Sequence, residues 1–408
     1  MGSRVFVTGH GIISAIGNNV PETLQSILSC KPGMGFTSYI DTIYSKEIPV
    51  AEVKISDKEM FGMLDSRAGI KTFSRASMMG IIAVSEALKH AGIVKTKELR
   101  TGLVSSTSVG GMERSEQFFN DYLKKSSAGR LRDIAGHDCG DHTEAISKYF
   151  GISDYVTTIS TACSSSANAI MLGARLIRNN LLDRVVVGGA DSLTRFTING
   201  FNTLQILDSK NCRPFDDTRS GLNIGEGSAF LVLESETCVR NANKQVLCEI
   251  KGYGNACDAF HQTASSPDGK GPALAMNKAL ETAGISPGDI SYINVHGTGT
   301  PNNDLSEGTA MKSVFGSNLA PFSSTKAFTG HTLGAAGSIE AVLSILSIQH
   351  RMIIPNLNFS VPIKELGLIP VTSLVQGIEL KNVMSNSFGF GGNNTCLIFS
   401  KVEDEHIY

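Results

Sequence analysis

A cysteine stands where a predicted strand gives way to a predicted helix. Four β-branched residues, 156–159, indicate a strand, and small or apolar residues recurring every three or four positions from Ala167 to Ile177 indicate a helix. Cys163 lies between them, just before three serines that suit a helix start. The positive end of the helix dipole favours thiolate, so we expect a pKa below the ~8.5 of a free cysteine. Cys163 is therefore a candidate nucleophile, with a buried structural cysteine as the alternative.

Two histidines of the second half are further candidates for the site. Residues 292–295 read as a strand, and His296 follows directly, where open α/β sheets carry their sites. His331 precedes a small-residue helix that begins near Gly334, as Cys163 precedes its own helix. If the two halves pack about a pseudo-twofold axis, both helix starts point into one pocket that also receives His296. Two ordinary loop histidines are the alternative.

The second half of the chain repeats the first. Residues 85–93 (SEALKHAGI) reappear as 277–285 (NKALETAGI), and the strands expected at 102–106 and 229–234 recur at 292–295 and 396–401. Matches in the same order predict an internal duplication, and alternating strands and helices predict a layered α/β protein with helices on both sheet faces. We expect an N-terminal half, residues 1–248, and a C-terminal half, residues 249–408, with the seam near residues 240–255.

Local signals predict the remaining elements. A strand at residues 5–8 is expected to end in a turn at Gly9 and Gly11. Helices are expected at residues 21–29 and 74–91, and a buried strand at 184–187. Residues 30–65 carry weak signals and are expected to wrap the surface.

Composition excludes several classes of function. The chain has 408 residues, 41% of them hydrophobic and 18% charged, with a net charge of −2, which is typical of a globular protein. Without a basic excess we expect no nucleic acid partner, and without a long apolar run or a signal peptide we expect no membrane association. Eight scattered cysteines without a Cys-x-x-Cys pair argue against a zinc ribbon or disulfide framework and favour a reducing, cytoplasmic compartment.

Five motifs in this order resemble the signature set of the β-ketoacyl-[acyl-carrier-protein] synthases of the elongating, Cys-His-His type, within the thiolase superfamily. They are Thr161-Ala-Cys163-Ser-Ser, Val295-His296-Gly-Thr298-Gly-Thr300-Pro301, Ser324-Thr-Lys326, Gly330-His331-Thr-Leu-Gly-Ala-Ala-Gly337 and Asn386-Ser-Phe-Gly-Phe-Gly-Gly392. The resemblance covers nearly the whole chain. It implies a duplicated, thiolase-like, five-layered αβαβα sandwich that usually forms homodimers.

The resemblance also implies a reaction. Cys163 would take an acyl group from a carrier-protein thioester. A malonyl group on acyl carrier protein would then lose CO2 and attack the acyl-enzyme as an enolate, giving a 3-oxoacyl-carrier two carbons longer. His296 and His331, as neutral or charged imidazoles, would donate to the enolate oxygen. We expect no metal and no bound cofactor, because the phosphopantetheine arm arrives on the carrier.

Further roles follow from the same resemblance. Lys326 would support the second histidine, and Glu340 would order the site, with a helix-surface charge as the alternative. Thr298 and Thr300 would hydrogen-bond the phosphopantetheine arm. Phe390 would act as a gate, and the N–H groups of Phe390 and Cys163 would form the oxyanion hole. Val109 and Phe201 would line the acyl tunnel.

Residues 124–145 depart from the fatty-acid elongation enzymes, which leaves the acyl substrate open. We expect a polar loop with Asp141 as a helix cap there. The alternative is a metal site built from His137, Asp138, Cys139, Asp141 and His142. Basic residues at spacings of four, Arg67, Lys71 and Arg75, form a predicted docking face for the acidic carrier, with an ordinary solvated helix face as the alternative.

Rival interpretations concern the class of condensing enzyme. A thiolase would need a second catalytic cysteine near the C-terminus, where residues 386–392 stand instead, and an initiating synthase would have asparagine where His331 stands. A catalytically silent partner subunit, as in chain-length-factor heterodimers, usually lacks the cysteine. An active enzyme is favoured, in fatty-acid or in polyketide or polyene synthesis, as a homodimer or a heterodimer.

Overall fold

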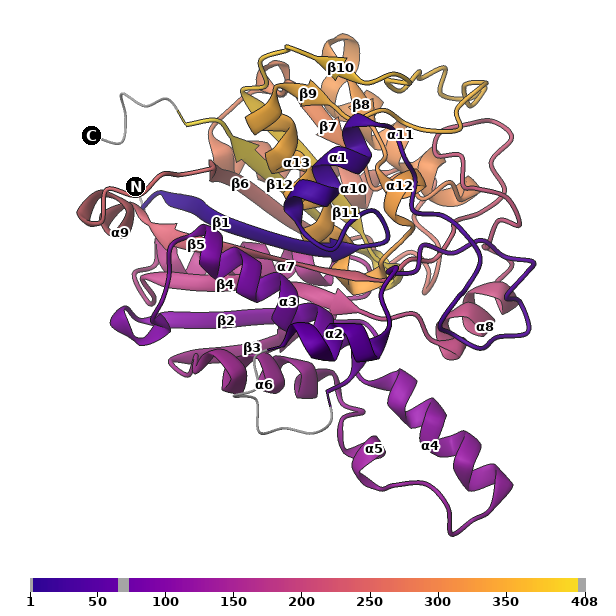
Figure 1. The fold of residues 1–408 in the computed structure, drawn as a ribbon. Helices are drawn as coiled ribbons and strands as arrows, with labels where there is room; N and C mark the ends of the chain where they lie inside the picture. The colour runs from indigo at the N-terminus through magenta and orange to yellow at the C-terminus, as the bar shows by residue number, and fades with distance from the viewer. Residues whose placement is uncertain (1–2, 65–72, 403–408) are drawn as a thin grey trace.

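The computed structural model describes residues 3–64 and 73–402 (Figure 1). Ten strands form one sheet in the order β3-β2-β4-β5-β1-β6-β12-β11-β7-β8. Five come from the first half: β3 (Tyr155–Ile159), β2 (Thr101–Ser106), β4 (Arg184–Asp191), β5 (Gly227–Ser235) and β1 (Val5–Ser14). Five come from the second half: β6 (Cys248–Cys257), β12 (Asn393–Ser400), β11 (Asn382–Phe388), β7 (Tyr292–Asn294) and β8 (Phe322–Ser323).

The strands of the two halves have the same order and the same directions. In the first half β2 runs parallel to β3 and β4, and β5 runs antiparallel to β4 and β1. In the second half β7 runs parallel to β8 and β11, and β12 runs antiparallel to β11 and β6. This repetition agrees with the internal duplication expected from the sequence. The boundary between residues 248 and 249, at the start of β6, stays a prediction.

Helices separate and cover the two half-sheets. Among the described residues, the half-sheets join where β1 pairs β6, through Phe6–Glu249 and Val7–Cys248. Helices α7 (Ser165–Arg178) and α13 (Ala336–His350) pack on each other and on strands of both halves, so they form the central layer. Helices α3 (Arg75–His90) and α6 (Cys139–Phe150) cover one outer face, and α10 (Lys270–Ala283) with α11 (Pro301–Phe315) covers the other. The five-layered αβαβα fold is therefore confirmed.

Smaller elements complete the chain. They are α1 (Val20–Leu28), α2 (Asp57–Met63), α4 (Met112–Lys124), α5 (Arg132–Ala135), α8 (Arg195–Thr203), α9 (Glu236–Asn241), α12 (Lys326–Thr329) and the strand pair β9 (Met352–Ile353) and β10 (Val375–Gln376). The helices predicted at 21–29 and 74–91 are confirmed as α1 and α3. In Figure 1, α4 and α5 protrude from the body; we call these two helices and the chain between them the arm.

The turn predicted at Gly9 and Gly11 is wrong, because β1 continues through both glycines to Ser14. A Cβ at Gly9 would lie 2.3 Å from the carbonyl oxygen of Ala87, and one at Gly11 would lie 2.1 Å from that of Ala83. The glycines therefore let α3 approach the strand closely. The second half repeats this contact, since Cβ atoms on Gly252 and Gly254 of β6 would meet the backbone of α10 at 2.3 and 2.2 Å.

Replacing Gly11 by alanine should lower the free energy of unfolding by about 1–3 kcal/mol, because α3 would have to move off the strand. Urea unfolding measures the loss. Gly62→Ala is the matched control, since a Cβ there meets nothing within 4 Å and Gly62 lies inside a helix. That change should be neutral or stabilising by up to about 1 kcal/mol. Equal losses in both variants would contradict the packing argument.

Candidate active site

Cys163 lies in a tight turn between β3 and α7. Ala162 adopts a φ of +52°, a left-handed conformation that costs a non-glycine residue roughly 1–2 kcal/mol. Ser165 holds this turn, because its Oγ donates to the Ala162 carbonyl at 2.6 Å and accepts from the Thr161 N–H at 2.8 Å. The turn delivers Cys163 to the start of the central helix, as predicted. Its side chain is 5% exposed.

The structure brings Cys163 and both histidines together. His331 Nε2 lies 3.0 Å from Cys163 Sγ, and the rings of His296 and His331 lie 5.3 Å apart at nearly a right angle. All three residues line one cavity of about 260 Å³. The predicted convergence of one residue from the first half with two from the second is therefore confirmed as geometry. Their catalytic roles stay predictions.

Burial dominates the electrostatics of the thiol. It raises the pKa of Cys163 to about 11, although the Lys326 charge and the Phe390 N–H act in the opposite direction. The prediction of a lowered cysteine pKa is therefore wrong for the resting site. Burial, reinforced by the Lys326 charge, also holds the pKa of His296 and of His331 well below the usual value. The resting pair is accordingly a neutral thiol beside a neutral imidazole.

Lys326 contacts His296 rather than the second histidine, His331, that it was expected to support. Its Nζ lies 3.3 Å from His296 Nδ1, and it forms a buried ion pair with Glu340 of α13. An ammonium group only donates hydrogen bonds, so Nδ1 accepts and the His296 proton resides on Nε2. Glu340 is 2% exposed, and burial raises its pKa to about 7. The alternative of a helix-surface charge at Glu340 is wrong.

Two carboxylates that the sequence analysis missed fix the His296 loop. Glu307 accepts from the backbone N–H groups of His296 at 2.9 Å and Gly297 at 2.8 Å. Asp304 accepts from Gly299 N–H at 3.2 Å. Both lie on α11, three residues apart and thus on one face of the helix. Two acidic residues at that spacing, directly after a glycine-rich loop, were the available signal.

The residues expected around the acyl and carrier groups are partly assembled. Thr298, Thr300, Phe201 and Phe390 line the cavity, and the rings of Phe201 and Phe390 stack at 5.8 Å. The N–H groups of Phe390 and Cys163, the expected oxyanion pair, both lie close enough to the thiol to lower its pKa. Val109 is not among the residues that line this cavity, so its place in the acyl tunnel stays a prediction.

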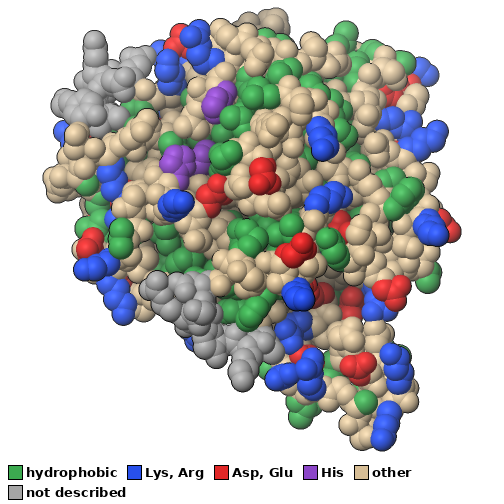
Figure 2. All heavy atoms as spheres, in the orientation of Figure 1, with side chains coloured by type: hydrophobic (Ala, Val, Ile, Leu, Met, Phe, Trp, Pro, Cys, Tyr) green, Lys and Arg blue, Asp and Glu red, His purple; other side chains and the backbone are tan. Residues whose placement is uncertain are grey.

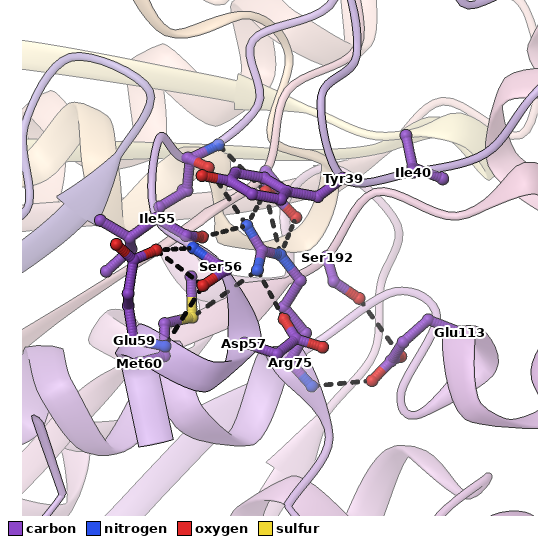
Figure 3. Close-up of polar contacts among 12 residues, drawn as sticks. Tyr39, Ile40, Ile55, Ser56, Asp57, Glu59, Met60, Arg75, Glu113 and Ser192 are labelled. Carbon is purple, nitrogen blue, oxygen red and sulfur yellow. Dashed lines mark hydrogen bonds and ion pairs between the residues drawn. The ribbon is translucent and has the colours of Figure 1, made fainter. Parts of the chain in front are cut away.

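Arg75 is not a docking residue for the carrier. Its guanidinium is buried and forms ion pairs with Glu226 and Asp57, under the ring of Tyr39 (Figure 3). Both carboxylates raise the pKa of Arg75, and they pair with its positive charge inside the protein, so that charge does not face a partner. The other two members of the predicted face, Arg67 and Lys71, lie outside the described residues.

Residues 124–145 are divided between helices and the non-helical stretches 125–131 and 136–138, so the expected polar loop is found only in part. They contain the end of α4, all of α5 and the start of α6. Asp138 is the residue before α6 and Asp141 lies in its first turn, so Asp141 as the cap is wrong. His142 is buried with Nε2 2.8 Å from Ser105 Oγ, and burial lowers its pKa to about 4. Within the part of the chain that the structure describes, no three His, Cys, Asp or Glu side chains are placed to share a metal ion.

Comparison with known families decides the classification. A family described as "Beta-ketoacyl synthase, N-terminal domain" matches residues 2–237, and "Beta-ketoacyl synthase, C-terminal domain" matches residues 247–360. The chain belongs to the β-ketoacyl synthase family. Members of this family are condensing enzymes of the acyltransferase class, which agrees with a cysteine and two histidines in one cavity.

Three relatives illustrate the breadth of this family. The "3-oxoacyl-[acyl-carrier-protein] synthase 2" of Staphylococcus aureus (strain COL) is 34% identical over 98% of this chain and 99% of its own length. The solved structure titled "The ishigamide ketosynthase/chain length factor" has a TM-score of 0.93 at 28% identity, covering 99% of this chain and 100% of its own. A chain of the solved complex between a ketosynthase and its chain length factor from Xenorhabdus doucetiae has a TM-score of 0.85 at 33% identity, covering 98% of both chains.

Over residues 3–64 and 73–402, no helix has both the length and the apolar character needed to cross a membrane.

Proposed function

We propose that this β-ketoacyl synthase catalyses the decarboxylative condensation of an acyl group with malonyl-[acyl carrier protein], giving 3-oxoacyl-[acyl carrier protein]. One observation carries the proposal. Cys163 Sγ lies 3.0 Å from His331 Nε2 inside a cavity that His296 also lines. A nucleophile, its base and a hydrogen-bond donor thus line one cavity.

Acyl transfer to Cys163 is the first step. As the acyl-carrier thioester arrives, His331 Nε2 takes the proton from Sγ, and the sulfur attacks the thioester carbonyl. The thiol of the phosphopantetheine arm leaves with a proton, and the acyl group stays on Cys163. The high pKa of the buried thiol makes this transfer to His331 necessary, because free thiolate is scarce at neutral pH. The N–H groups of Phe390 and Cys163 would stabilise the carbonyl oxygen as it becomes negative.

Condensation is the second step. The malonyl group loses CO2, and the electron pair of the broken C–C bond forms an enolate on the carrier thioester. Lys326 donates to His296 Nδ1 and so keeps the imidazole proton on Nε2. The Nε2–H group then donates a hydrogen bond to the enolate oxygen. The enolate carbon then attacks the acyl-enzyme carbonyl, the C–S bond to Cys163 breaks, and the Cys163 sulfur leaves as a thiolate that takes up a proton from water. The product carries two more carbons.

We propose that the enzyme itself holds no metal and no cofactor. The reaction involves no net oxidation, and decarboxylation supplies the carbanion. The phosphopantetheine arm is brought by acyl carrier protein, and Thr298 and Thr300, which lie in the cavity, are the residues proposed to bind it. All eight cysteines are free, which supports a reducing, cytoplasmic compartment as the proposed location.

Intact-mass spectrometry of the enzyme and carrier tests this function. The enzyme is mixed with a panel of acyl-carriers of different chain length and saturation, with and without malonyl-carrier, beside Cys163→Ala. We expect acyl mass on the wild type only, followed by a carrier product two carbons longer. The best acyl donor distinguishes fatty-acid from polyketide or polyene synthesis. A folded wild type that accepts no acyl group would contradict the proposal.

The second candidate function is a subunit that needs a partner, and the exposed side chains of the arm favour it. Leu131 is 79% exposed, Leu123 is 66% exposed and Phe119 is 57% exposed. Figure 2 shows Lys and Arg side chains gathered beside hydrophobic ones on this protruding part of the molecule. Strand β3 also lies at the edge of the sheet, where no further strand of the described chain pairs with its outer side. Apolar side chains exposed together in this way are typical of an interface.

We propose that a second copy of this chain covers the arm. A non-identical ketosynthase-like chain is the alternative, because two of the similar structures are titled with a chain length factor. Native mass spectrometry should show a dimer for the wild type and a monomer for Leu123→Glu. Ile369→Glu is the matched control, since Ile369 is 68% exposed elsewhere on the surface. A monomeric wild type that acts only after a partner is added would favour the heterodimer.

A further inference from the structure

A buried carboxylate beside the active site accepts hydrogen bonds from two separate segments of the chain. Asp191, the last residue of β4, is fully buried. Its Oδ1 accepts from the Thr107 hydroxyl and from the backbone N–H groups of Ser108 at 3.0 Å and Val109 at 3.3 Å. Its Oδ2 accepts from Ser108 N–H at 2.9 Å and from Gly334 N–H at 2.6 Å. The segment after β2 belongs to the first half, and Gly334 belongs to the second.

Each of these partners adjoins the reacting groups. Gly334 follows His331 by three residues, in the short turn Leu333–Ala335 that leads into α13. Ser108 Oγ donates to the carbonyl oxygen of Ala162, the residue before Cys163, at 3.4 Å. Asp191 is therefore joined by one hydrogen bond to the His331 segment and, through Ser108, to the Cys163 turn.

The junction leaves no space for a side chain on Gly334. A Cβ on Gly334 would lie 2.7 Å from Asp191 Oδ2 and 2.8 Å from the backbone nitrogen of Ser108. The backbone around His331 is also held from the other side, where its N–H donates to the Asn223 carbonyl at 2.8 Å. The Asp191 carboxylate thus completes a clamp on the segment that carries His331.

We propose that Asp191 is a positioning residue that sets the distance between Cys163 and His331 by tying the Thr107–Val109 loop of the first half to Gly334 of the second. The proposal rests on the proposed function, because it takes Cys163 as the residue that accepts the acyl group. Asp191 touches neither substrate nor the reacting sulfur and acts through the two segments that it joins.

The negative charge of Asp191 provides a readout that a purely structural role would not give. Burial raises the pKa of Asp191 to about 6, so the carboxylate is ionised above that pH. Its charge in turn raises the pKa of Cys163. Removing the charge should make the thiol easier to ionise, while loosening the clamp should make acyl transfer slower.

The experiment compares two rates in Asp191→Asn and in the wild type. The first is alkylation of Cys163 by iodoacetamide between pH 6.5 and 9.5, read by peptide mass spectrometry at that cysteine. The second is single-turnover transfer of an acyl group from acyl-carrier to Cys163. We expect alkylation at pH 8 to rise about threefold to tenfold, which corresponds to a pKa lower by about half a unit to one unit. We expect acyl transfer to fall about 10- to 100-fold, since small misplacements of catalytic groups are that costly.

Two further variants separate charge from position. Asp191→Glu keeps the charge, so its alkylation profile should match the wild type and its acyl transfer should exceed that of Asp191→Asn. Gly334→Ala pushes the backbone away from the carboxylate without removing the charge, so acyl transfer should fall while alkylation does not rise. Gly334→Ala also carries the test if Asp191→Asn does not fold.

Asp216→Asn is the matched control for lost stability. Asp216 is another buried carboxylate that accepts from backbone N–H groups, namely those of Thr218 at 2.8 Å, Ser360 at 2.6 Å and Val361 at 2.9 Å. It should lose thermal stability without the opposite shifts of the two rates. The proposal is overturned if both rates fall together in Asp191→Asn, or if neither changes. A wild type that accepts no acyl group counts against the proposed function instead. The alkylation rates then test the role of Asp191, and an unchanged alkylation profile in Asp191→Asn overturns that role.

Discussion

Replacing His296 by alanine should slow condensation about 100- to 1,000-fold while acyl transfer to Cys163 stays within a fewfold of the wild type. The hydrogen-bond partner of the thiol is His331 Nε2, so His296 is not needed to accept the thiol proton. The enolate would lose the donor that Lys326 holds ready on Nε2, and removing one such donor typically costs ~10²–10³ in rate. Single-turnover mass spectrometry with acyl-carrier and then malonyl-carrier measures the two steps separately.

Two histidine controls make this result specific. His331→Ala should slow acyl transfer itself, because the thiol then has no base within hydrogen-bond distance. His137→Ala should change neither step, since His137 is exposed just after α5 and its Nδ1 contacts only Ser115 among the described residues. Loss of acyl transfer in His296→Ala as severe as in His331→Ala would show that the two histidines do not divide the steps as proposed.

Local sequence signals were sufficient to predict individual strands and helices whose residue types favour one secondary structure. The β-branched run before Cys163 and the small-residue helix after it are found as β3 and α7. The repeated alanine-rich segments predicted the two equivalent helices, α3 and α10. The convergence of Cys163, His296 and His331 followed from the duplication, because equivalent positions of two packed halves share one axis.

The same signals failed where tertiary packing changes the meaning of a residue. Glycine marks a turn in isolation, but Gly9 and Gly11 remain in the strand because α3 lies against them. Arg75 has helical spacing with two other basic residues, yet its partner Glu226 lies 151 residues away in the chain. No window along the sequence could have revealed that ion pair.

The electrostatics of the site could not be predicted from local structure either. A helix start favours thiolate, and the Cys163 site has that helix start. The thiol is buried, however, and the loss of water raises its pKa more than the nearby donors lower it. Asp304 and Glu307 were missed for a related reason, since their function is to accept backbone N–H groups of a loop whose shape the sequence does not state.

Replacing Lys326 by methionine should remove condensation and also lower the free energy of unfolding by about 3–5 kcal/mol, because Glu340 would stay buried without its cation. Lys326 lowers the pKa of Glu340, so in this variant that pKa should rise above about 7. The native state then holds a proton that the unfolded chain, with a glutamate pKa of about 4.3, releases more readily. The stability deficit should therefore grow as the pH rises from 6 to 8. Urea unfolding at both pH values measures this change.

The double variant Lys326→Met with Glu340→Gln separates stability from catalysis. Without a buried carboxylate, most of the lost unfolding free energy should return, and its dependence on pH should disappear. Condensation should not return, because His296 Nδ1 would still lack the ammonium donor that keeps the proton on Nε2. A double variant that condenses at the wild-type rate would show that Lys326 serves only to neutralise Glu340. A double variant that is stable and inactive would place Lys326 in the positioning of His296.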